Sequence, residues 1–166
     1  FLIKELITPI YIKEEIMNSD LLLSYIACTK AAELWFHAAH HVTKGKGFAG
    51  DHNFLYSKIY KTLGDDLDAL IEKGIGLYDE EQLACPILIS NLASKIVCSF
   101  ETPVNQSDNL IAENALNVLI YHLTNLESLY ENLSKTKDFT IGFDDLLASM
   151  ANKYESYIYM LKQRLK

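Results

Sequence analysis

The sequence predicts an all-α protein that folds as a four-helix bundle. Apolar residues recur at helical spacing along nearly all of the 166-residue chain, in four long segments of about 23 to 29 residues. At ~1.5 Å per residue, each segment would form a helix ~35 to 44 Å long, which is typical of such bundles. Because 49% of the residues are hydrophobic and only three are proline, the chain can bury a sizeable core.

The first two long helices are expected to lie side by side. The first covers residues 14–42, and a glycine-containing turn ends it. The second covers residues 51–73, with Asp51 suited to cap its start and with Gly74 and Gly76 expected to stop it. Because the loop between the two helices is short, they should be antiparallel neighbours.

The remaining helices follow a long connection. A shorter helix fits residues 80–97, broken or begun again at Pro86, and residues 99–106 form a link. The third long helix fits 107–134, and the fourth runs from 143 to the end of the chain. The segment between the second and third long helices is long enough to cross the whole bundle. This predicts the single-crossover topology of ferritin-like folds, with a short helix in the crossover.

Charge and composition limit the classes of function. No repeat or composition shift divides the chain, so residues 1–166 are expected to form one domain. A formal charge of −7 disfavours contact with nucleic-acid phosphates. No apolar run reaches the ~18 residues of a membrane helix, and we expect no membrane contact. Cys28, Cys85 and Cys98 lie in apolar surroundings, which indicates buried thiols in a reducing, cytoplasmic setting.

Histidines concentrate where the first helix gives way to the second. His40, His41 and His52 are three of the five histidines in the chain. Asp68 and Glu72 follow about four turns along the second helix, as do two further aspartates, Asp65 and Asp66. Imidazole and carboxylate ligands together suit Fe(II) and similar first-row ions. The sequence has no Glu-x-x-His, so a di-iron centre inside one bundle is disfavoured.

The two groups of ligands are too far apart to meet within one chain. About 20 helical residues separate them by ~20 to 30 Å. Two subunits related by a two-fold axis could bring the histidines of one to the acids of the other, giving two equivalent sites per dimer. The alternative, which spacing alone leaves open, is that the histidines decorate helix ends and the acids form a solvated face.

These residues carry a resemblance to a known family. The stretch HHVTKGKGF from His40 to Phe48, then His52, then Asp68-x-x-x-Glu72, resembles the Dps proteins, the mini-ferritins named as DNA-binding proteins from starved cells. The C-terminal stretch DDLLASMANKYESYIYMLK is also similar to the last helix of that family. The resemblance covers most of the chain, including the short helix in the crossover.

The resemblance implies an iron-storing shell. A Dps-like protein would form a hollow particle of twelve subunits that binds Fe(II), oxidises it with hydrogen peroxide or oxygen, and stores the product as mineral, protecting against oxidative stress. His40 and His52 would bind and oxidise the metal together with Asp68 and Glu72 of the neighbouring subunit. Iron would be the metal, and DNA binding would be weak or absent because the visible ends carry few basic residues.

Three departures from the family pattern bear on this activity. His41 stands where the family usually has tryptophan, and Tyr56 stands where it has an acidic ligand. The chain is also one residue longer than expected between His52 and Asp68; a helical bulge near Gly64 could absorb that residue. Otherwise the acidic face would turn by about 100°, and Asp65 or Asp66 could take over as ligand.

A different class of function therefore stays open. The protein could be a non-catalytic ferritin-like scaffold or interaction protein with a degenerate metal site. Two other histidines have open roles as well. His37, one turn before His40, could join the metal site or fill the core, and His122 is expected to fill core or surface space.

Overall fold

The computed structural model describes residues 17–166, and this part of the chain contains helices and connections without any strand. The helices are α1 (Asn18–Val42), α2 (Phe48–Gly50), α3 (Ser57–Tyr78), α4 (Pro86–Val97), α5 (Asp108–Leu133) and α6 (Ile141–Arg164). A π-helical turn, Asp51–Tyr56, joins α2 to α3, and a short 3₁₀ turn, Glu81–Ala84, precedes α4. The predicted all-α class is confirmed. The first three residues of the predicted helix 14–42 lie outside the described residues.

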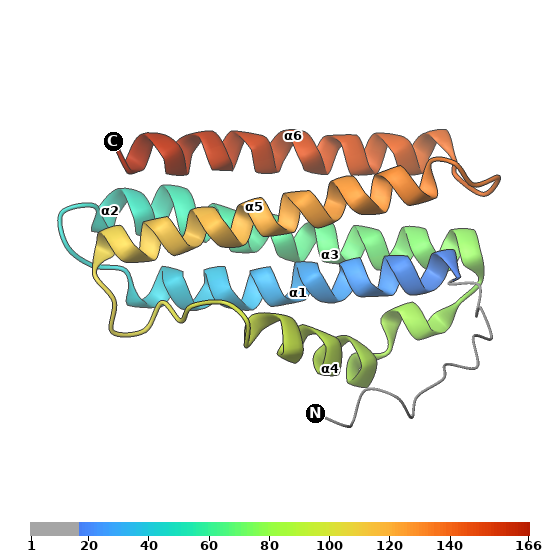
Figure 1. The fold of residues 1–166 in the computed structure, drawn as a ribbon, viewed down its shortest axis with the longest axis horizontal. Coiled ribbons are helices and arrows are strands. Elements are labelled where there is room, and N and C mark those ends of the chain that lie inside the picture. Colours follow the sequence, from blue (N-terminus) through green and yellow to red (C-terminus); the bar gives the residue numbers. More distant parts are fainter. Residues whose placement is uncertain (1–16) are drawn as a thin grey trace, which may run out of the picture.

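The four long helices form the predicted bundle. In Figure 1, α1 and α3 run in opposite directions in one layer, and α5 and α6 do the same in the other. The connection from the end of α3 to the start of α5 passes along the length of the bundle, with α4 lying against α1 on its way. This is the single-crossover topology expected from the sequence.

The core lies between the two layers. Each long helix turns its apolar stripe inward, as the helical period of those residues predicts. Large side chains that are completely buried include Leu22, Ile26, Phe36, Ile59, Leu63, Leu119, Phe143 and Tyr154. On the outer side of α1, Ala27 and Ala31 meet Ala93 of α4, and these small side chains let the crossover helix pack closely.

Capping residues set the ends of the later helices close to where the sequence places them. The Ser107 hydroxyl accepts a hydrogen bond from the backbone N–H of Leu110 at 3.3 Å, which caps α5. The Thr140 hydroxyl accepts one from the N–H of Phe143 at 3.2 Å, which caps α6. The predicted helices 107–134 and 143–166 are therefore correct to within two residues at each end.

The predicted end of the second helix at Gly74 is wrong. Helix α3 continues to Tyr78 and ends only where Asp79 adopts the left-handed conformation, with φ of 52°. A Cβ on Gly74 would lie 2.6 Å from the Leu22 side chain and 2.7 Å from that of Leu83. The glycine is there because two other elements press against the helix at this point, and it does not break the helix.

The predicted start of the second helix at Asp51 is also wrong. Helical structure begins at Phe48, and Asp51 lies inside it, buried, and opens the π-helical turn. A π-helical turn takes in one more residue than an α-turn does. Helix α3 is regular around Gly64, so the bulge predicted there is wrong, and the π-helical turn at Asp51–Tyr56 is the place in this segment that can accommodate an extra residue.

Two expectations drawn from composition have mixed outcomes. The cysteines are free thiols, but only Cys28 is buried, whereas Cys85 is half-buried and Cys98 is exposed. The prediction of buried thiols is therefore wrong for Cys98. Within residues 17–166, none of the helices has the length and apolar character needed to cross a lipid bilayer.

Candidate metal centre

His40 and His52 face each other across the α1–α3 corner. Their rings stack with centroids 3.9 Å apart and planes 22° from parallel. Nδ1 of His40 lies 3.0 Å from the carbonyl oxygen of His52, and Nδ1 of His52 lies 2.8 Å from the carbonyl oxygen of His40. A carbonyl oxygen only accepts, so each Nδ1 carries the hydrogen and donates it. In the neutral rings, both Nε2 atoms keep a free lone pair, which is the arrangement of a metal-binding histidine.

Asp51 and His52 are consecutive residues of the π-helical turn, and they point to different partners. Asp51 points into the protein, where Nε of Arg164 donates to both of its carboxylate oxygens at 3.1 Å. The same guanidinium reaches Asp108 at 3.3 Å and Asn109 at 3.0 Å, at the start of α5. Burial raises the pKa of Asp51, and Arg164 opposes that rise. Because the Asp51 carboxylate is bound by Arg164, it is not available as a metal ligand, and it anchors the turn that carries His52.

The surroundings of His40 favour the neutral imidazole that a metal requires. Burial is the largest cause lowering its pKa, and the neighbouring imidazoles of His52, His41 and His37 add to the effect. A hydrogen bond to the backbone of His52 acts in the other direction. A ring held neutral loses no proton when a cation binds, so binding is favoured near neutral pH.

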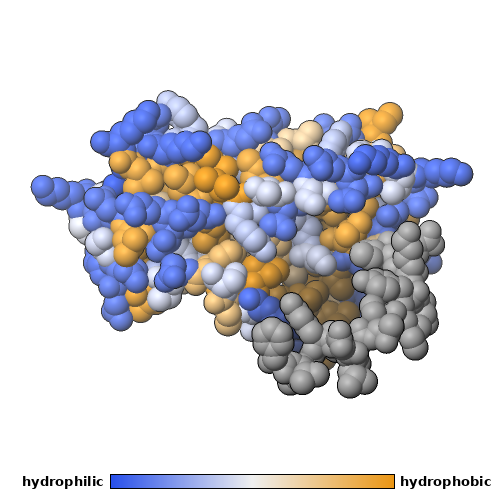
Figure 2. Space-filling model, in the orientation of Figure 1, coloured by the Kyte–Doolittle hydropathy of each residue, from blue (hydrophilic) through white to orange (hydrophobic). Residues whose placement is uncertain are grey.

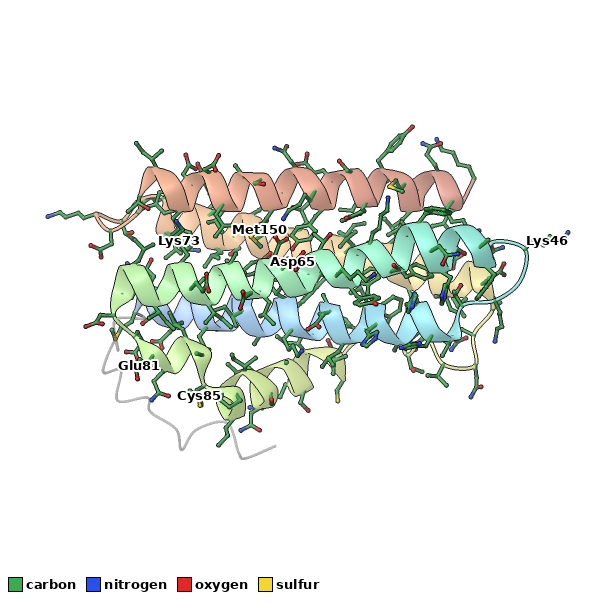
Figure 3. The ribbon with its side chains drawn as sticks, turned by 180° about the vertical axis from the view of Figure 1, so that it is seen from behind. Lys46, Asp65, Lys73, Glu81, Cys85 and Met150 are labelled. Carbon is green, nitrogen blue, oxygen red and sulfur yellow. The ribbon has the colours of Figure 1, made fainter. Side chains whose placement is uncertain are left out.

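The proposed acidic ligands lie on α3. Asp68 and Glu72 are both exposed and one helical turn apart, so they project from the same side of the helix. Lys46, in the loop beside the histidines, and Lys73, next to Glu72, lie toward opposite ends of the bundle (Figure 3). Within residues 17–166, no three side chains of the histidine, cysteine or acidic type come together to hold a metal. One chain therefore does not bring its imidazoles and these acids together.

The alternative acidic ligands differ in availability. Asp66 is buried and accepts hydrogen bonds from Lys153 and from the Tyr154 hydroxyl, the latter at 2.5 Å. Asp66 therefore belongs to the core of its own subunit and cannot reach a metal at an interface. Asp65 is exposed and lies on α3 between the two ends of the bundle (Figure 3). Of these two aspartates, only Asp65 is accessible to a neighbouring subunit.

Tyr56 does not replace the acidic ligand whose position it takes. Its side chain is completely buried, and its ring lies 6.2 Å from that of Phe36. The hydroxyl has no hydrogen-bond partner among the described residues. Burial raises the pKa of this phenol, so it stays protonated. The residue belongs to the core, and one ligand of the family pattern is absent from this corner.

The fold of this chain is similar to that of a known protein, although its sequence is not. No protein-family model matches the chain, and no curated protein matches it by sequence. Among solved structures, the chain is similar to the Dps protein of Mycobacterium smegmatis, in its tetragonal crystal form. The TM-score is 0.74, with 17% sequence identity over 90% of this chain and 86% of the other. The chain has a Dps-like, ferritin-like fold.

The centre of this Dps-like bundle holds a polar cluster that sequence reasoning missed. Each long helix contributes one buried side chain, namely Tyr25, Asp66, His122 and Tyr154. The Tyr25 hydroxyl lies 3.1 Å from Nδ1 of His122, and the His122 ring lies 4.6 Å from that of Tyr154. Burial lowers the pKa of His122 to about 3, so the ring is neutral. Of the two predicted places for His122, core or surface, the structure shows the core, and its hydrogen-bond partner is 97 residues away in the chain.

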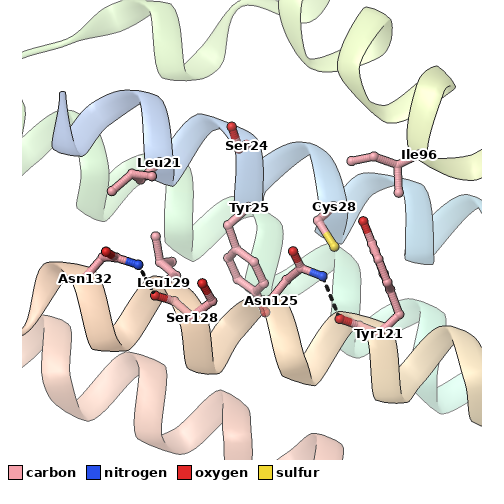
Figure 4. Close-up of a pocket in the computed structure, with 10 residues that line it drawn as sticks. All are labelled: Leu21, Ser24, Tyr25, Cys28, Ile96, Tyr121, Asn125, Ser128, Leu129 and Asn132. Atoms are coloured by element: carbon pink, nitrogen blue, oxygen red, sulfur yellow. Dashed lines mark hydrogen bonds between the residues drawn. The ribbon is translucent and has the colours of Figure 1, made fainter. Parts of the chain in front are cut away.

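A separate cavity of about 240 Å³ opens between α1, α4 and α5 of the Dps-like fold (Figure 4). Its walls include Tyr25, Cys28 and Leu129. The amides of Asn125 and Asn132 on its rim donate to backbone carbonyls of their own helix, at 2.8 and 2.7 Å. These polar groups are already satisfied and do not converge on a common point. We therefore place the chemistry at the histidine corner, away from this cavity.

Proposed function

We propose that the protein is an iron-oxidising mini-ferritin. In this proposal His40 and His52 of one subunit bind Fe(II) together with Asp68 and Glu72 of its neighbour. The observation that carries it is the reciprocal pair of hydrogen bonds between His40 and His52. These bonds fix the orientation of both rings and leave both Nε2 lone pairs available, as second-shell hydrogen bonds do for the histidine ligands of metal sites.

The exposed acids supply the other half of the centre. Asp68 and Glu72 form no ion pair with any other residue of the described part of the chain, 17–166, so in this proposal their carboxylates act across an interface. Two-fold symmetry would bring α3 of each subunit antiparallel to its copy, which places each acidic pair beside the histidine corner of the partner. Mixed imidazole and carboxylate ligation suits Fe(II).

Assembly into a closed shell, most simply of twelve subunits as in the Dps proteins, follows from the same proposal. The outer surface has apolar areas that a shell would cover. In Figure 2, hydrophobic atoms gather between α5 and α6 toward the C-terminal end of α6, where Ile120, Leu123 and Ile158 line a groove. A subunit surface of this kind favours contact with further copies.

The proposed reaction removes two electrons from two Fe(II) ions and transfers them to one molecule of hydrogen peroxide. The O–O bond breaks, two protons are taken up, and the products are two Fe(III) ions and two water molecules. Oxygen is the alternative oxidant. The chain contributes ligands that hold the substrate ions close together, and it consumes peroxide without releasing single-electron products. We place this protein in the cytoplasm, because its three cysteines are free thiols and free thiols are typical of a reducing compartment.

The experiment that tests this proposal compares the intact protein with a His40→Gln/His52→Gln variant. Fe(II) oxidation by peroxide is followed by the ultraviolet absorbance of the ferric product, and particle mass is measured in parallel. We expect the rate in the variant to fall at least about tenfold, because removing an orienting partner of a metal ligand alone costs that much. A rate equal to that of the wild type, or a monomeric wild type in solution, would refute the proposal.

A second candidate function rests on Tyr56. Because this buried phenol replaces an acidic ligand, the protein could be a shell or interaction scaffold without iron chemistry. The two candidates differ in one measurement. A scaffold gives a large particle in which wild type and the double-histidine variant oxidise Fe(II) at the same rate as buffer.

A further inference from the structure

Two histidines outside the proposed iron centre form a pair of their own. His37 and His41 are one helical turn apart on α1, and both are exposed. Their ring centroids are 4.8 Å apart, with an angle of 42° between the planes. His37 also stacks on Tyr60 at 4.5 Å, which holds its ring against the surface of the bundle.

This spacing fits two rings that bind a single cation. Metal–nitrogen distances of ~2.0–2.1 Å and near-tetrahedral to right-angled geometry place the centroids of two coordinated imidazoles about 4.5 to 5.2 Å apart. The separation of 4.8 Å between His37 and His41 falls within that range. The His40 and His52 centroids are closer, at 3.9 Å, because those rings stack. The two pairs therefore differ in geometry.

The pair lacks an acidic partner among the described residues. Glu33, one turn before His37, accepts a hydrogen bond from Lys30 at 2.6 Å, and none of the ion pairs in residues 17–166 involves a histidine. A nitrogen-ligand site binds Zn²⁺ and Cu²⁺ more tightly than Fe²⁺, because Fe²⁺ lies lower in the Irving–Williams order of affinities. The remaining coordination positions would be taken by water, since both rings face solvent.

We infer that His37 and His41 form a second cation site on α1, selective for a late first-row divalent ion such as Zn²⁺ and complete within one subunit. It is separate from the proposed iron centre, because it uses neither His40 nor His52 and needs no acid from a neighbouring chain. A cation bound there lies next to the iron centre, since the His41 ring is 5.1 Å from that of His40.

The test is equilibrium dialysis of the intact protein against Zn²⁺ at neutral pH. We expect a His37→Gln/His41→Gln variant to bind one Zn²⁺ per subunit fewer than the wild type. Both single variants should weaken that site at least about tenfold, because each removes half of a chelate. The matched control, Lys44→Gln/Lys46→Gln, changes two exposed side chains in the adjacent loop and should keep the full number of bound ions.

Two outcomes would overturn the inference. One is an unchanged Zn²⁺ stoichiometry and affinity in the His37→Gln/His41→Gln variant. The other is a loss that arises from only one of the two single substitutions, since that would exclude chelation by the pair. Both histidines are exposed, so the variants should fold, and circular dichroism checks this. Iron oxidation does not enter the measurement, so failure of the iron proposal and failure of this one are distinguishable.

Discussion

His40 and His52 each donate a hydrogen bond from Nδ1 to the backbone carbonyl oxygen of the other, at 3.0 and 2.8 Å. The pair ties the last turn of α1 to the π-helical turn that precedes α3. It also leaves both Nε2 atoms free to bind a cation. The two halves of the proposed iron centre therefore differ in whether a single chain can form them. The imidazole half is pre-organised within one chain, and the acidic half depends on assembly.

The acidic half is tested by Asp68→Asn and Glu72→Gln. Each substitution removes charge from an exposed side chain, so the stability of the subunit should change by less than about 0.5 kcal/mol. The rate of Fe(II) oxidation should nevertheless fall at least about tenfold, because the change removes a ligand. Asp65→Asn, on the same helix, is the matched control and should retain the rate. Loss of activity in the control alone would show that Asp65 is the ligand instead.

The glycines near the end of α3 give a matched pair for the fold. Gly74→Ala would force a Cβ against the buried side chains of Leu22 and Leu83, and it should lower the free energy of unfolding by about 1–3 kcal/mol. Gly76→Ala meets no atom within 4 Å and should raise the free energy by up to about 1 kcal/mol, because alanine favours helix. Urea denaturation measures both. Equal effects at the two positions would contradict the packing described at Gly74.

The core hydrogen bond between Tyr154 and Asp66 should contribute measurably to stability. Tyr154→Phe removes the phenol that donates to a buried carboxylate at 2.5 Å, and the free energy of unfolding should fall by about 1.5–3 kcal/mol. Tyr159→Phe, at an exposed position on the same helix, should have no effect beyond about 0.5 kcal/mol. If Tyr154→Phe is as stable as the wild type, the bond contributes nothing.

His122 should make the protein sensitive to acid. Its pKa is about 3 in the folded protein, because burial disfavours the charged ring, and ~6.5 in the unfolded chain. Between these values only the unfolded chain binds the proton. The free energy of unfolding should therefore fall as pH drops below ~6.5, by up to about 2–3 kcal/mol at pH ~4.5.

The substitution His122→Asn isolates this contribution, since asparagine keeps a polar partner for Tyr25 but does not titrate. Urea denaturation at neutral and acidic pH, on both proteins, gives the comparison. The substitution removes one titrating group, so the variant should lose less stability between the two pH values. A parallel loss in both proteins would show that His122 is not the cause.

The helices and their order could be predicted from the sequence because they depend on local periodicity and capping. Ser107 and Thr140, for example, cap α5 and α6 close to where the pattern changes. The misplaced boundaries depend on contacts between distant segments. Nothing local distinguishes Gly74, which fits beneath Leu22 and Leu83, from a glycine that ends a helix.

The candidate site was predictable in the same partial way. Spacing placed His40 and His52 at one corner, and the structure confirms that the two rings meet there. The burial of Asp51 against Arg164 could not be seen, because the partners are 113 residues apart. The pairing of these histidines with Asp68 and Glu72 stays a prediction, since it requires a second chain.

The most direct test of the iron centre is a crystal structure of the assembled protein after anaerobic soaking in Fe(II), with anomalous data collected at the iron edge. We expect a peak ~2.0–2.2 Å from Nε2 of His40 or His52 and equally close to a carboxylate oxygen of Asp68 or Glu72 from the neighbouring subunit. A particle in which these imidazoles and carboxylates face away from each other, with no iron between them, would contradict this expectation.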